Sequence, residues 1–127
     1  MKRLALLLTI GLAVSGCDGH VRTFRPPPEA ARAGAGAADQ EKRLADALAE
    51  VARQRGCTRT EPKFESKDYT VIVSYWKAVD HGSLQMRLIK ETRSGAYKVV
   101  MIDWPSCARS AESVAAEAAV REKLTGD

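Results

Sequence analysis

The sequence predicts a small α+β domain built from a helix, a three-stranded antiparallel β-meander and a C-terminal helix. Apolar residues recur at helical spacing between about residues 39 and 55. The period then changes to two along Tyr69–Trp76, where β-branched and aromatic residues are typical of a strand. His81-Gly82 and Ser94-Gly95 stand where hairpin turns would divide three strands.

The first helix is predicted over residues 39–55. Asp39 can cap its start, because an aspartate side chain accepts hydrogen bonds from the free amides of the first turn. Leu44, Leu48 and Val51 then form one apolar face. Gly56 is suited to a left-handed C-terminal cap, and residues 58–67, which include Pro62, are predicted to be a loop.

Two further strands follow the first, over about residues 84–92 and 96–103. Trp104-Pro105 interrupts the last strand, because proline cannot continue the ladder of hydrogen bonds. Ser106 or Ser110 can cap a final helix that reaches about Lys123. This helix is rich in alanine, so it should form by propensity while packing weakly.

Two-residue turns would set the register of the meander. Val79 then faces Leu84, Tyr75 faces Leu88, and Leu88 faces Met101. The first helix is expected to cover the apolar face that this register creates. That predicted core face contains Val71, Val73, Tyr75, Val79, Leu84, Met86, Leu88, Val99 and Met101.

The second face of the predicted sheet is also apolar, although a solvated face should be polar. The same counting places Trp76 opposite Arg87, Arg87 opposite Ile102, and Ile89 opposite Val100. One interpretation is that the last helix covers this face, or that arginine and lysine stems shield it. The other is a surface for a partner or for self-association, where aromatic and arginine anchors are common.

The N-terminus has the composition of an export signal. Met1-Lys2-Arg3 is positively charged, and the apolar run from Leu4 to Val14 is too short to span a bilayer. Val14-Ser15-Gly16-Cys17 resembles the lipobox of bacterial lipoproteins. The resemblance implies that residues 1–16 are a signal peptide, and that Cys17 becomes the N-terminus carrying a diacylglycerol and an amide-linked acyl chain. The alternative is an ordinary secretory signal with a chance cysteine.

Residues 17–38 are interpreted as the lipidated N-terminus and a spacer, which leaves 39–127 as the folded domain. Pro26-Pro27-Pro28 favours extended structure, and residues 33–37 are only alanine and glycine. A flexible spacer of this length would separate anchor and domain by about 25 Å. Asp18 directly after Cys17 resembles the pattern of enterobacterial lipoproteins that stay in the inner membrane, so that membrane is favoured over the outer one.

Three cysteines are present, and lipidation of Cys17 would leave two. In an oxidising compartment the remaining pair, Cys57 and Cys107, is expected to form a disulfide. The alternative is a catalytic dyad of Cys57 and His81. From Asp39 onward fifteen basic residues face fourteen acidic ones, so the formal charge of +4 does not indicate nucleic-acid binding.

No active site is recognisable in the sequence. No histidine has metal-ligand spacing with another histidine or a cysteine, so no metal or cofactor is expected. Asp80 and Asp103, near predicted strand ends, could form a carboxylate pair but are more typical of solvated residues. Ser94-Gly95-Ala96-Tyr97 is similar to the short loop of periplasmic lysozyme inhibitors, some of which are lipoproteins, and this resemblance implies an inhibitor.

The sequence therefore favours a non-enzymatic lipoprotein of the bacterial cell envelope, facing the periplasm, that binds another envelope protein or itself. Its expected binding residues are Trp76, Arg87, Ile89, Val100 and Ile102. An inhibitor of a lysozyme-type periplasmic enzyme is the alternative, and an enzyme is the least favoured class.

Overall fold

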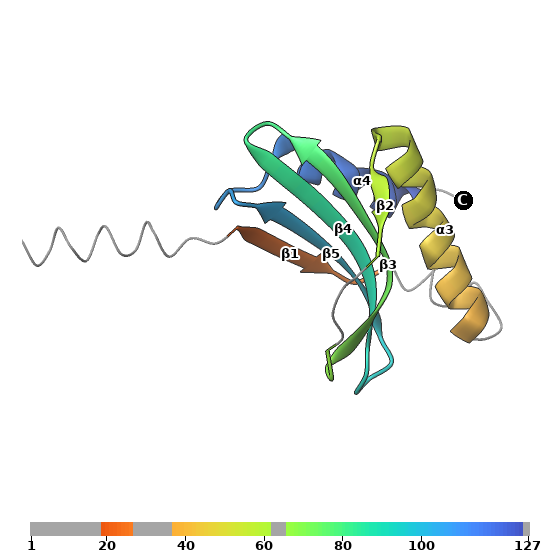
Figure 1. Ribbon diagram of the computed structural model, residues 1–127. Helices are drawn as coiled ribbons and strands as arrows, with labels where there is room; N and C mark the ends of the chain where they lie inside the picture. The colour runs from red at the N-terminus through yellow and green to blue at the C-terminus, as the bar shows by residue number, and fades with distance from the viewer. Residues whose placement is uncertain (1–18, 27–36, 62–65, 126–127) are drawn as a thin grey trace, which may run out of the picture.

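The computed structural model describes residues 19–26, 37–61 and 66–125, which form one antiparallel sheet and two helices (Figure 1). The sheet has five strands in the order β1-β5-β4-β3-β2. The elements are β1 (His20–Phe24), α3 (Ala37–Arg55), β2 (Thr58–Thr60), β3 (Tyr69–Val79), β4 (Gly82–Glu91), β5 (Tyr97–Trp104) and α4 (Ala111–Thr125). The predicted α+β class is confirmed.

The first predicted helix is present as α3, and it begins two residues before Asp39. It ends at Gly56, whose φ of 77° is the left-handed conformation expected of a C-terminal cap. The amide of Cys57 donates to the carbonyl of Ala52 at 2.8 Å and closes the last turn.

The prediction of three strands is wrong, because the meander gains a strand at each edge. β2 lies in the predicted loop and pairs with β3. β1 lies in the predicted spacer and pairs with β5 along its whole length, from His20 opposite Asp103 to Phe24 opposite Val99. The folded unit therefore begins well before residue 39.

The predicted register is also wrong, by two residues in each hairpin. The first turn consists of Asp80-His81, with a φ of 64° at His81, so Val79 pairs with Gly82. In the second hairpin Leu88 pairs with Val99. Because a shift of two residues keeps each side chain on its face, most of the predicted core face is preserved.

Val71 is the exception on the core face. A β-bulge between Val71 and Val73 leaves Val73 opposite Leu88 and Val71 opposite Ile89. Since the bulge reverses the alternation of side chains, Val71 lies on the second face of the sheet with Ile89.

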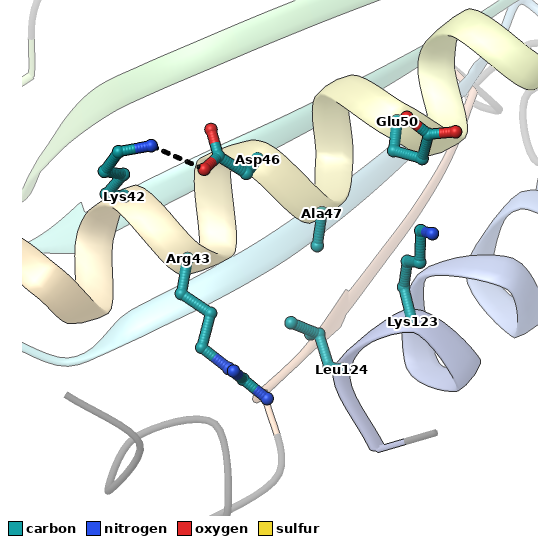
Figure 2. Close-up of a pocket in the computed structure, with 7 residues that line it drawn as sticks. All are labelled: Lys42, Arg43, Asp46, Ala47, Glu50, Lys123 and Leu124. Atoms are coloured by element: carbon teal, nitrogen blue, oxygen red, sulfur yellow. Dashed lines mark hydrogen bonds and ion pairs between the residues drawn. The ribbon is translucent and has the colours of Figure 1, made fainter. Parts of the chain in front are cut away.

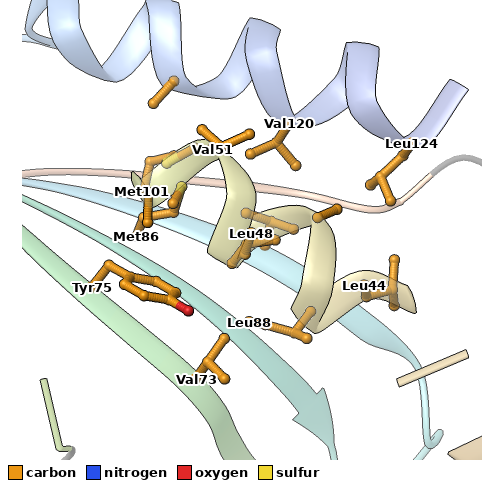
Figure 3. Packing of buried hydrophobic residues seen from close by; sticks show 14 of the residues in the cluster. Leu44, Leu48, Val51, Val73, Tyr75, Met86, Leu88, Met101, Val120 and Leu124 are labelled. Atoms are coloured by element: carbon orange, nitrogen blue, oxygen red, sulfur yellow. The ribbon is translucent and has the colours of Figure 1, made fainter. Parts of the chain in front are cut away.

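Both helices pack on the same face of the sheet, and they share one core (Figure 3). α3 contributes the predicted Leu44, Leu48 and Val51. α4 contributes Ala116, Val120 and Leu124, each almost fully buried. The last helix therefore supplements the first one and does not cover the second face.

The predicted Cys57–Cys107 disulfide is not formed, because Cys57 has a free thiol. Cys57 directly precedes β2, at one edge of the sheet, whereas Cys107 follows β5. Strands β4 and β3 lie between these two strands, which places them about 14 Å apart. The sequence alone could not show this separation, since it arises from the strand order.

Candidate functional site

Neither α3 nor α4 covers the opposite face of the sheet, and we call this face the open face. Its side chains follow from the register of the five strands. They include Val21, Thr23, Thr58, Thr60, Val71, Ser74, Trp76, Gln85, Arg87, Ile89, Lys98, Val100, Ile102 and Trp104.

One row of the open face crosses all five strands. Val21 pairs with Ile102, Ile102 with Gln85, Gln85 with Trp76, and Trp76 with Thr58. Val21 is 62% exposed and Trp76 is 40% exposed, while Ile102 between them is half-buried. The row is an uncharged strip with an aromatic residue near one end and an aliphatic residue at the other.

Arg87 belongs to the neighbouring row, between Ser74 and Val100. The Ser74 hydroxyl beside it is buried and accepts a hydrogen bond from the Thr60 hydroxyl at 3.1 Å. The Arg87 side chain is half-buried, and its Nε–H has no hydrogen-bond partner among the described residues. This Nε–H is itself buried, so the unpaired donor lies beneath the open face.

The far end of the open face is less available. Ile89 is only 9% exposed, so this predicted binding residue offers little contact area. Lys98 beside it is paired with Glu91 at 2.6 Å. Hydrogen bonds from Lys98 and Ser94 hold the pKa of Glu91 below its usual value.

The five predicted binding residues thus share one face, as expected, but they meet different partners. Trp76 lies opposite Gln85 and not Arg87, and Arg87 lies opposite Val100 and not Ile102. The sequence analysis missed Val21 and Trp104, which is 52% exposed. Val21 lies in the segment that was predicted to be a spacer, and only the pairing of β1 with β5 shows that it belongs to the open face.

A groove with a volume of about 460 Å³ lies between α3 and α4 (Figure 2). Its walls carry charges of both signs, and its floor is apolar. Lys42 donates to Asp46 at 2.8 Å, and Glu50 is paired with Arg53. The lining residues are Lys42, Arg43, Asp46, Ala47, Glu50, Lys123 and Leu124. None of the described residues that line the groove is a cysteine, a histidine or a hydroxyl nucleophile.

A charged cluster under α4 joins β1 to the rest of the fold. Glu117 accepts hydrogen bonds from Arg22 at 2.5 and 3.1 Å and from Arg121 at 2.8 Å, and it is also paired with Arg109. Burial alone would raise the pKa of Glu117, but these arginines lower it to about 2. Arg121 also lies 4.2 Å from the centre of the Phe24 ring.

The two aspartates considered as a carboxylate pair lie in different environments. Asp80 is in the exposed β3–β4 turn, whereas Asp103 is buried on the core face opposite His20. The carboxylate oxygens of Asp103 and the hydroxyl of buried Ser113 have no hydrogen-bond partner among the described residues. Because Asp103 and Ser113 are enclosed, they do not present a reactive group to a substrate.

The Cys57–His81 dyad finds no support. Burial raises the pKa of the Cys57 thiol, and the charges acting on it belong to Lys77, Glu112 and Arg55. A raised pKa disfavours the thiolate that would act as a nucleophile.

The loop that resembles lysozyme inhibitors does not present its tyrosine. Tyr97 is 5% exposed and donates a hydrogen bond from its hydroxyl to Glu41 at 2.9 Å. Burial, together with this hydrogen bond, raises the pKa of Tyr97 to about 12. Tyr97 therefore belongs to the core.

Among the described residues, no three histidine, cysteine, aspartate or glutamate side chains are grouped so that they could hold a metal ion. No helix in this part of the chain has the length and apolar character needed to cross a membrane. The predicted lipidation site, Cys17, lies outside the described residues. The chain matches no protein-family model, curated protein or solved structure.

Proposed function

We propose that this protein is a lipid-anchored lipoprotein of the bacterial cell envelope that binds another envelope protein through the open face. The observation that carries this proposal is the row of Val21, Ile102 and Trp76 on a sheet face that neither α3 nor α4 covers. Exposed apolar surface of this kind is a common mark of an interaction site.

The chemistry of the open face describes the partner it would fit. Trp76 is an anchor of the type that dominates binding energy in protein interfaces, and an apolar pocket would receive it. Arg87 is half-buried beside this row and adds a positive charge, which favours a carboxylate nearby on the partner. A second copy of this chain is the other possible occupant, and the capture experiment below separates the two.

The anchor is supported by the charged start, the short apolar run and the Val14-Ser15-Gly16-Cys17 motif. Two or more acyl chains would give stable attachment to a membrane without help from the domain. The domain would face the periplasm, and Asp18 favours the inner membrane.

Replacing Trp76 with alanine should abolish capture of the partner and leave the fold intact. A photo-crosslinking residue at position 85, next to Trp76, would trap the partner in intact envelopes, and mass spectrometry would identify it. Val114→Ala is the matched control, because Val114 is an exposed apolar residue on α4. It should keep capture at the level of the unmodified protein.

Leu88→Ala provides the opposite control for stability. Leu88 is fully buried, so its truncation should cost about 2–5 kcal/mol, while Trp76→Ala should leave the melting temperature nearly unchanged. The proposal is refuted if Trp76→Ala unfolds the domain, or if the folded Trp76→Ala variant captures the partner normally. A crosslink only to a second copy would identify self-association.

Lipidation is tested by intact mass spectrometry of the protein extracted from a Gram-negative envelope. The expected species begins at Cys17 and carries acyl chains, and a Cys17→Ser variant should lack them. A soluble species that begins at a later residue would contradict the anchor. A disulfide between Cys17 and Cys107 would also contradict the anchor, because the sulfur of a lipidated Cys17 is already bonded to the diacylglycerol as a thioether.

A further inference from the structure

The position of β1 makes the link between Cys17 and the folded domain very short. β1 begins at His20, so only Asp18 and Gly19 separate it from the lipidation site. Three residue steps reach at most about 11 Å, compared with the ~25 Å predicted for a flexible spacer. The stretch rich in proline, alanine and glycine follows β1 in the chain, and therefore connects β1 to α3.

Gly19 shows that the chain is already held against the domain at this point. A Cβ atom on Gly19 would lie 2.7 Å from the carbonyl oxygen of Asp103 and 3.0 Å from the ring of Trp104. Only a residue without a side chain allows so close an approach. The last residue before the sheet is therefore packed on the end of β5.

At the end of the domain around Gly19, residues 104–108 are exposed and uncharged, and the β3–β4 turn with exposed Asp80 lies at the same end. β1 begins there, β5 ends there, and the connection from β5 to α4 leaves from it (Figure 1). Trp104 is 52% exposed, and the next four residues are exposed and carry no charged side chain. Arg109, which follows, is paired with Glu117.

We infer that residues 104–108 form a membrane-docking surface that rests on the lipid headgroup layer beside the anchor. This inference depends on the lipidation of Cys17 proposed above. A tether of about 11 Å holds this end of the domain at the bilayer surface. Tryptophan is favoured at that depth, because its ring has an apolar body and an N–H group that can remain hydrated.

The docking surface also sets the orientation of the open face. The strands leave the membrane from the Trp104 end, so the row of Ile102 and Trp76 lies about 7 Å further along β5, and the row of Val100 and Arg87 about 14 Å. The open face therefore points sideways, close to the bilayer. A partner that docks on it would itself be bound to the same membrane.

Tryptophan fluorescence of the acylated full-length protein in vesicles tests this arrangement. The chain has two tryptophans, so Trp76→Phe leaves Trp104 as the only emitter, and Trp104→Phe is the matched control. In vesicles of phosphatidylethanolamine and phosphatidylglycerol, Trp104 emission should shift to the blue, and brominated acyl chains should quench it. Trp76 emission should be quenched much less.

A spacer insertion separates the docking surface from the anchor. A Gly/Ser segment of about ten residues, placed between Asp18 and Gly19, would add about 17 Å to the tether. This variant should still float with vesicles, and its Trp104 quenching should fall toward the level of Trp76. Circular dichroism of each variant confirms that the domain remains folded.

The outcomes distinguish the two proposals. Protein that fails to float with vesicles contradicts the lipid anchor. A second outcome is that the protein floats, but Trp104 is quenched by a water-soluble quencher and not by brominated lipid. This result would contradict the docking surface and would still be consistent with the lipid anchor. Quenching that persists unchanged after the insertion would show that the short tether is not what positions Trp104.

Discussion

Glu117→Gln is expected to weaken the attachment of β1 to the domain. Glu117 is the shared acceptor for Arg22 on β1 and for Arg109 and Arg121 beside it. Its side chain is 7% exposed, so these contacts are only partly screened by water. Glutamine has nearly the same shape, and the substitution therefore removes the charge while it disturbs the packing little.

The pKa of Glu117 gives the magnitude and the sign of the effect. This pKa falls from an ordinary value of 4.5 to about 2 in the folded protein. A lowered pKa in the folded state stabilises it above pH 4.5, and that stability is lost as the pH falls toward 2. Each unit is worth about 1.4 kcal/mol, which sets an upper limit of about 3.5 kcal/mol. Because the arginine partners are partly exposed, we expect about 2 kcal/mol.

Urea unfolding of both proteins at several pH values measures this effect. The unmodified protein should be about 2 kcal/mol more stable than Glu117→Gln at neutral pH, and the difference should vanish near pH 2. Asp46→Asn is the control, since the Lys42–Asp46 pair is exposed and its removal should leave the melting temperature unchanged. A difference that is the same at both pH values would show that packing, and not charge, causes the loss.

Three further predictions follow from single residues. Cys57 should react slowly with thiol reagents in the folded protein and faster as the pH rises, because burial raises its pKa; rapid reaction at neutral pH would contradict this. One of the three tyrosines should ionise near pH 12 in a spectrophotometric titration, and Tyr97→Phe should remove that step. The raised pKa of Tyr97 in the folded state stabilises it below pH 10, and this contribution should be lost as the pH rises from 10 to 12. Gly82→Ala should lower the melting temperature strongly, because its Cβ would lie 2.2 Å from the carbonyl oxygen of Trp104; an unchanged melting temperature would show that β4 and β5 can separate at this end.

The elements predicted correctly are those with local signals. α3 and the three meander strands each carry their periodicity within a short stretch, so no knowledge of the fold is needed to find them. The prediction of the register set by the hairpin turns was also wrong for a local reason. The predicted turn residues are His81-Gly82, but the turn consists of Asp80-His81, with the positive φ at His81, and Gly82 is required by the close approach of β4 to Trp104.

The edge strands could not be predicted because their partners are distant in sequence. β1 has five residues, and its interactions depend on pairing with β5 and on the Arg22–Glu117 contact, which joins residues 95 positions apart. The sequence also did not show which face of the sheet α4 covers, for a different reason. Ser113 and Glu117 lie on its buried side with Ala116 and Val120, so the helix has no apolar stripe to identify.

The position of β1 changes what the lipid anchor would do. A spacer of about twenty residues would let the domain turn freely above the membrane, and neither end of the sheet would be favoured. With β1 in the sheet, the link is two residues long, and Arg22 and Phe24 hold that strand against α4. Glu117 would then affect the orientation of the domain on the membrane as well as its stability, because detachment of β1 would restore a long, flexible tether. Glu117→Gln should therefore reduce the quenching of Trp104 by brominated lipid in vesicle-bound protein, without reducing flotation.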